Sequence, residues 1–96
     1  MLLARVIGNV VSTRKSESMT GSKLLIVEPV DYKEQKADGK PLVAVDSVGA
    51  GVGEIVLIVQ GSSARLTETT KDRPADASII AIVDYVEFEG KRTFAK

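Results

Sequence analysis

The chain has 96 residues, of which 44% are hydrophobic and 4% aromatic, and its 13 basic residues balance 13 acidic ones. A net charge of zero gives no long-range attraction to nucleic acid or anionic lipid. Cysteine and histidine are absent, which removes disulfides, thiol nucleophiles, the usual zinc ligands and the commonest general base. We therefore expect one small domain spanning residues 1–96, not an enzyme, with no cofactor and no metal site.

We expect no targeting signal among the N-terminal residues. Arg5 interrupts the short apolar start and polar Asn9 follows it, so no signal-peptide stretch forms. No apolar run approaches the ~20 residues of a membrane helix. The sequence predicts a cytoplasmic protein.

Five stretches rich in β-branched residues, separated by glycine, proline and aspartate, predict strands. In chain order they cover residues 2–13, 23–30, 41–48, 54–60 and 78–88. Five short strands in fewer than 100 residues favour a small closed barrel, because closure removes the exposed edges of a lone sheet. The predicted fold is mainly β, a five-stranded OB-like β-barrel. Ser62 or Ser63 is expected to cap one short helical turn ending near Glu68.

Two strands have unusually continuous apolar runs, Ile55–Val59 and Ile79–Val83. A barrel strand normally alternates apolar inward and polar outward, so these runs place apolar side chains on the outer surface. Burial against other copies of the chain is the simplest resolution. Alternatively, the helical turn and the polar stretch 66–77 cover the barrel within one chain.

A glycine-rich segment, residues 49–53, precedes Glu54. Its spacing differs from the dinucleotide-binding G-x-G-x-x-G pattern, a strand rather than a helix follows it, and Glu54 would repel a phosphate. The segment predicts a tight turn whose glycines supply positive φ or allow close backbone approach. On this view Gly51 has no room for a Cβ.

The segment from Gly61 to Arg65 contains two serines but does not match the nucleophile pattern G-x-S-x-G, and no histidine exists to activate them. A capped turn is the simpler interpretation, with Arg65 pairing to Asp46, Asp76 or Asp84. Asp46 and Asp84 are themselves expected to cap turns or to meet an arginine such as Arg5, rather than to act as an acid–base pair.

An OB-like barrel also suggests an alternative function, binding of single-stranded nucleic acid. The basic residues Arg14, Lys15 and Lys23 favour it, but nearby acidic residues dilute their charge and few aromatic residues are available for stacking. The sequence shows no evident binding surface for nucleic acid.

Six segments in order carry a family resemblance: residues 4–11 (ARVIGNVV), 21–27 (GSKLLIV), 42–46 (LVAVD), 49–54 (GAGVGE), 61–65 (GSSAR) and 82–84 (IVD). Together they resemble the EutN/CcmL family of bacterial microcompartment shell proteins, whose members form the five-fold vertices of the shell. The resemblance implies a homo-pentameric ring in the cytoplasmic microcompartment shell, beside hexameric tiles. The residues expected at the ring contacts and turns are Gly49, Gly51, Gly53, Glu54, Ser62, Ser63, Ala64, Arg65, Ile79, Ile80 and Ile82.

Overall fold

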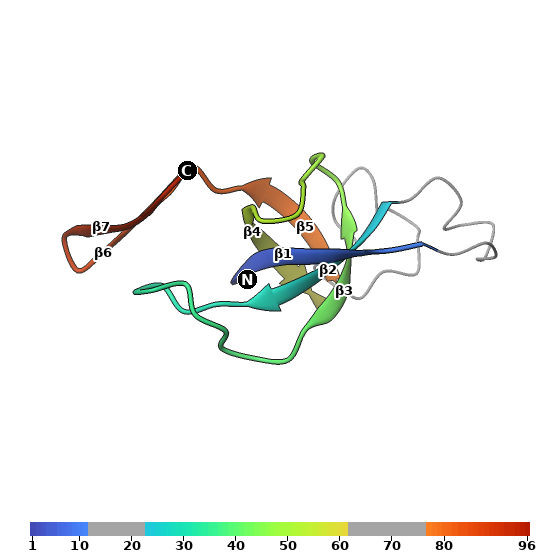
Figure 1. Ribbon diagram of the computed structural model, residues 1–96, viewed down its shortest axis with the longest axis horizontal. Helices are drawn as coiled ribbons and strands as arrows, with labels where there is room; N and C mark the ends of the chain where they lie inside the picture. The colour runs from blue at the N-terminus through green and yellow to red at the C-terminus, as the bar shows by residue number, and fades with distance from the viewer. Residues whose placement is uncertain (12–22, 62–76) are drawn as a thin grey trace.

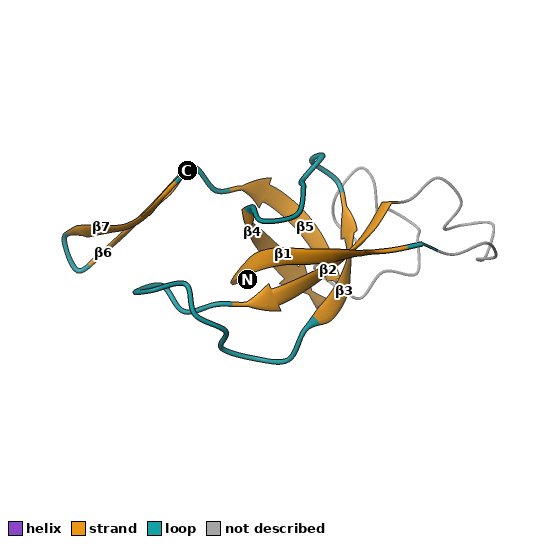
Figure 2. Cartoon of the chain, in the orientation of Figure 1, coloured by secondary structure: helices purple, strands orange, loops and turns teal. Residues whose placement is uncertain are grey.

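The structure is a computed structural model that describes residues 1–11, 23–61 and 77–96. The regular elements in these ranges are all strands (Figure 2). In chain order they are β1 (Leu2–Val10), β2 (Lys23–Pro29), β3 (Leu42–Asp46), β4 (Ile55–Gln60), β5 (Ala77–Ile82), β6 (Tyr85–Phe88) and β7 (Lys91–Ala95). The helical turn expected after Ser62 lies outside the described residues.

The first five strands close into a barrel in the order β1-β2-β3-β5-β4, with β4 returning to pair with β1 (Figure 1). All neighbouring pairs are antiparallel except β3 and β5, which are parallel and pair only at Val45–Ser78 and Asp46–Ile79. The prediction of a mainly β, five-stranded barrel is confirmed.

The barrel interior is filled by small and β-branched side chains, as the composition indicates. Alternate residues of every barrel strand point inward and pack into one cluster. Its fully or almost fully buried members are Ala4, Val6, Leu25, Val27, Ala44, Ala50, Val56, Ile58, Ala77 and Ile79. Ala50 belongs to the loop between β3 and β4 rather than to a strand, so this loop closes one end of the barrel.

The continuous apolar run of β4 is buried on both sides within one chain. Val56 and Ile58 face the barrel core. On the outer side, Ile55 packs with Leu3 and Val30 in a second cluster, which Leu57, Val83, Val86 and Phe94 complete. The expectation that a lone copy leaves this strand uncovered is therefore wrong. The outer side of β4 is covered in part by C-terminal residues between 83 and 94, which the sequence analysis did not consider as a cover.

Those C-terminal residues form a hairpin that the sequence analysis missed. The predicted last strand, 78–88, is two strands, because β5 ends at Ile82 and β6 begins at Tyr85. β6 pairs with β7, and Figure 1 shows the hairpin projecting beyond one end of the barrel. Thr93 Oγ1 donates a 2.6 Å hydrogen bond to the Tyr32 carbonyl oxygen, and the Tyr32 and Phe88 rings lie 6.1 Å apart. The hairpin is thus attached to the loop after β2.

Candidate functional site

The glycine turn, residues 47–54 between β3 and β4, is held at its first end by Asp46 and Lys23. Asp46 Oδ1 accepts hydrogen bonds from the backbone N–H groups of Val48 and Gly49, both at 3.0 Å. Lys23 Nζ lies 3.5 Å from Asp46 Oδ2 and donates a 2.8 Å hydrogen bond to the Ala50 carbonyl. The Asp46 side chain is 1% exposed, so Lys23 compensates a charge that is almost removed from water.

The second end of the glycine turn is held by Glu54 and by strand β1. Glu54 Oε1 accepts a 2.7 Å hydrogen bond from the Gly51 N–H, while Gly53 N–H donates to the Val6 carbonyl at 2.8 Å. Lys96 Nζ pairs with Glu54 Oε2 at 2.8 Å. The Lys96 hydrogen bond first, and then the Gly51 N–H, hold the pKa of Glu54 below its usual value.

Two of the three glycines expected in the turn have a backbone that favours glycine. Gly49 has φ +81° and Gly53 has φ +94°, values that L-residues seldom adopt. Gly51 is different, because a Cβ there would meet only Glu54 Oε1, at an ordinary 3.6 Å. The expectation that Gly51 has no room for a Cβ is wrong. The glycine requirement of a single chain lies at Gly49 and Gly53.

The turn displays apolar rather than catalytic groups. Val48 is 40% exposed and Val52 is 62% exposed. The turn joins strand to strand, and the carboxylate of Glu54 already occupies one of its backbone donors. A phosphate loop needs free donors at a helix N-terminus, so this geometry does not suit a nucleotide. Among the described residues no cluster of histidine, cysteine or acidic groups could hold a metal ion.

The remaining expected site residues fall into two groups. Ser62, Ser63, Ala64 and Arg65 lie outside the described residues, as do the proposed pairings of Arg65. Ile79 is fully buried in the barrel core, whereas Ile80 and Ile82 are partly buried. The part of the chain that the structure describes therefore brings together Gly49, Gly51, Gly53 and Glu54 in one turn, with Ile79 beneath it, since Ser47 Oγ donates to the Ile79 carbonyl.

The two aspartates have structural surroundings. Asp46 caps the glycine turn, and Asp84 is exposed, with its carbonyl accepting a 2.8 Å hydrogen bond from the Lys96 N–H. Arg5 was expected to meet one of them, but its guanidinium donates to the Gln35 carbonyl at 3.1 Å. Sequence reasoning missed the roles of Lys23 and Lys96. Lys23 is the cross-strand partner of Asp46 in the β2–β3 pair, a register that the sequence alone does not give.

The described aromatic residues do not form a base-stacking platform. Phe94 packs in the second cluster, Phe88 lies against Tyr32, and the guanidinium of Arg92 covers the ring of Tyr85 at 4.3 Å. Lys23, one of the basic residues noted above, is paired with Asp46, and Arg14 and Lys15 lie outside the described residues. Stacking faces and free cations are what an OB-like nucleic-acid site needs. Nothing in the described surface favours that alternative.

Comparison with known proteins decides the family. Residues 1–84 match the EutN/CcmL family, described as "Ethanolamine utilisation protein EutN/carboxysome". The chain belongs to the EutN/CcmL family. Within the described ranges, no helix of this family member is long and apolar enough to cross a membrane.

Relatives within the family are similar over almost the whole chain. The shell vertex protein GrpN of Rhodospirillum rubrum is 49% identical over 87 residues, which cover 91% of this chain and 97% of GrpN. The shell vertex protein EutN of Salmonella typhimurium is 45% identical over 96 residues, covering 100% and 96% of the two chains. Both relatives are named as bacterial microcompartment shell vertex proteins, not as enzymes or nucleic-acid-binding proteins.

Solved structures agree with the sequence comparison. The carboxysome protein CcmL of Nostoc superimposes with a TM-score of 0.92 at 43% identity, covering 100% of both chains. The structure of GrpN, described as a pentameric microcompartment shell protein, superimposes with a TM-score of 0.82 at 49% identity over 92% of this chain and 99% of that one. The fold of the described residues, hairpin included, is thus similar to that of the CcmL structure.

Proposed function

We propose that this chain is a structural shell protein of a bacterial microcompartment, and that five copies form a closed ring at the vertices of the shell, in the cytoplasm. The observation that carries the proposal is the similarity, over nine-tenths of the chain or more, to proteins named as shell vertex proteins. The GrpN structure, which is described as pentameric, supports the subunit number.

The mechanism of such a ring is geometric. A flat layer of six-fold tiles cannot close on itself, and a five-fold unit at each corner supplies the missing curvature. The subunit suits this role because its first five strands close into a barrel, which leaves little of their edges free to pair with other strands. It needs no reactive group, only a fixed shape and two kinds of contact, one between copies and one with tiles.

The contacts between copies are assigned here to the residues expected from the sequence. The glycine turn, with Gly49, Gly51, Gly53 and Glu54, is the first element, the segment Ser62–Arg65 the second, and the partly buried Ile80 and Ile82 the third. Ile79 acts indirectly, because it is buried in the barrel core beneath the turn.

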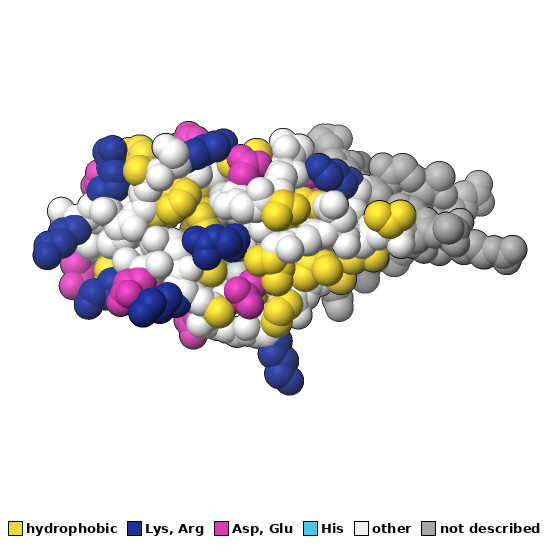
Figure 3. All heavy atoms as spheres, viewed as in Figure 1, with side chains coloured by type: hydrophobic (Ala, Val, Ile, Leu, Met, Phe, Trp, Pro, Cys, Tyr) yellow, Lys and Arg dark blue, Asp and Glu magenta, His cyan; other side chains and the backbone are white. Residues whose placement is uncertain are grey.

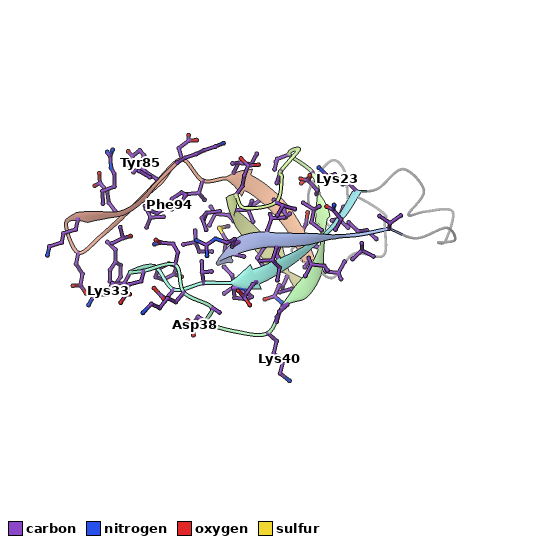
Figure 4. The ribbon with its side chains drawn as sticks, viewed as in Figure 1. Lys23, Lys33, Asp38, Lys40, Tyr85 and Phe94 are labelled. Atoms are coloured by element: carbon purple, nitrogen blue, oxygen red, sulfur yellow. The ribbon has the colours of Figure 1, made fainter. Side chains whose placement is uncertain are left out.

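The contacts with hexameric tiles are assigned to the charged loop after β2. This loop, residues 31–40, carries exposed side chains of both signs, including Lys33, Asp38 and Lys40, which point away from the barrel in Figure 4. Mixed charges of this kind suit a polar contact, because complementary charges on the partner give the contact its specificity.

Native mass spectrometry of the purified chain at micromolar concentration tests the ring. The expected species contains five copies of the 10.2 kDa chain, about 51 kDa in total. Only monomers at this concentration would contradict the proposal. Co-expression with the hexameric tiles of the same compartment tests the vertex role. We expect closed polyhedra with the chain, and open sheets or tubes without it.

A further inference from the structure

A closed five-membered ring needs two different contact patches on every copy, because each copy meets its two neighbours through different sides. This inference rests on the proposed function and asks which patches these are. The apolar run of β4 cannot supply one, since Ile55, Val56 and Ile58 are already 0% exposed in a single chain. Two other apolar patches on the described surface meet the requirement.

The first patch, here called the sheet face, is the outer side of β1, β2 and β3. Leu25, Val27 and Ala44 point into the core, so alternation turns their neighbours outward. The register places Val10 beside Leu24, and Ile26 beside Val43. The sheet face therefore consists of Val10, Leu24, Ile26 and Val43.

The sheet face is open to solvent in a single copy. Val43 is 47% exposed, and the other three side chains are partly exposed. Figure 3 shows hydrophobic side chains gathered in a band over β2 and β3. Gly8, opposite Ile26, adds no side chain of its own, and a Cβ there would lie 3.4 Å from Ile26 Cδ1. The result is a low, apolar surface, with Glu28 next to Ile26 on the same side of β2.

The second patch is the tip of the glycine turn, with the exposed side chains of Val48 and Val52. Hydrogen bonds from Lys23 to the Ala50 carbonyl and from the Gly51 N–H to Glu54 fix the turn on both sides of its middle. A surface that is already rigid loses little conformational entropy when it binds. Binding through Val48 and Val52 therefore costs little conformational entropy.

We propose that the glycine turn of one copy packs on the sheet face of the next copy, with Val48 and Val52 covering Ile26 and Val43. The turn closes one end of the barrel, through buried Ala50, whereas the sheet face lies on the barrel side. The two patches consequently look in different directions, as a head-to-tail contact requires. The turn cannot bend onto its own sheet face, because Gly53 N–H is bonded to Val6 on β1.

Disulfide trapping tests this contact directly, because the chain contains no cysteine of its own. The double variant V52C/V43C should give, on mild oxidation, a ladder of linked chains that ends at five. A disulfide needs Cα atoms within about 7 Å, so only residues in direct contact link efficiently. The matched control is V52C/K91C, since Lys91 is also exposed but lies on β7 in the C-terminal hairpin, outside both patches. It should link at least tenfold less.

A second measurement does not depend on disulfides. Val52→Asp and Val43→Asp each place a charge in the proposed contact, and each should weaken assembly at least tenfold in native mass spectrometry. Both side chains are exposed, so the monomer should keep its far-ultraviolet circular dichroism spectrum. Lys91→Asp is the control, at an exposed position of β7 outside both patches, and should assemble as the unmodified chain does.

The outcomes separate this inference from the proposed function. If the unmodified chain is monomeric, the ring itself is refuted. If it forms a five-chain species while V52C/V43C links no better than V52C/K91C, the ring stands and the proposed contact is overturned. Normal rings from Val43→Asp with loss of tile co-assembly would also overturn it, because the sheet face would then serve the tiles.

Discussion

The glycine turn offers a matched pair of substitutions that separates backbone strain from lack of space. Gly53 has φ +94°, yet a Cβ there would meet nothing within 4 Å. The φ of Gly51 is not in this positive range, and a Cβ there would make only an ordinary van der Waals contact. Gly53→Ala therefore changes the backbone preference alone, and Gly51→Ala changes almost nothing in the folded state.

The expected magnitudes follow from these two environments. An L-residue held in the left-handed region costs about 1–2 kcal/mol, so Gly53→Ala should lower the free energy of unfolding by that amount. Gly51→Ala restricts the unfolded chain without straining the folded one and should be neutral or stabilising by up to about 1 kcal/mol. For a chain of this size, 1 kcal/mol corresponds to about 4–8 °C in Tm.

Thermal and urea unfolding, followed by circular dichroism, measure both variants. Protein concentration must be equal in all samples, because assembly adds stability by mass action. We expect Gly53→Ala to melt clearly below Gly51→Ala. Equal midpoints, or a larger loss for Gly51→Ala, would refute the assignment of the glycine requirement to positive φ.

Two further predictions concern the C-terminal residues. The pKa of Glu54 is lowered by Lys96 and by the Gly51 N–H. The ionised form of Glu54 therefore adds stability above the usual pKa, and this stability is lost as the pH falls through the lowered pKa. Urea unfolding between neutral and acidic pH should show the loss, and the loss should be smaller in Glu54→Gln. Phe94→Ala removes a partly buried ring from the second cluster and should cost about 2 kcal/mol. Hydrogen exchange should then quicken in β6 and β7 while β2 stays protected, and equal acceleration in both would contradict a separately anchored hairpin.

The barrel was predictable because its strands carry local signals. Runs such as residues 23–30 and 54–60 combine β-branched residues with glycine or aspartate at their ends, and these signals are read without knowledge of tertiary structure. The glycine turn was predictable for the same reason. The break between β5 and β6 was missed although Asp84 was expected to cap a turn, because Val83 continues the apolar pattern and its packing with Ile55 is a tertiary contact.

Several parts of the site depend on long-range contacts and were therefore missed. The sequence suggested an acidic partner for Arg5, but its guanidinium donates to the carbonyl of Gln35, thirty residues away. Lys96 meets Glu54 only because the hairpin returns the chain to the barrel. Gly51 resembles its neighbours in sequence, and only the backbone angles distinguish it from Gly49 and Gly53.

The internal cover of β4 changes what assembly must achieve. If the apolar strand were exposed in a single copy, folding and ring formation would be one event, as in obligate oligomers whose interfaces resemble a divided core. Instead, Ile55 is buried by Leu3, Val30 and the hairpin of the same chain. A subunit with a complete core can fold first and assemble afterwards through small surface patches. In the proposed ring, such patches permit a copy to dissociate without unfolding.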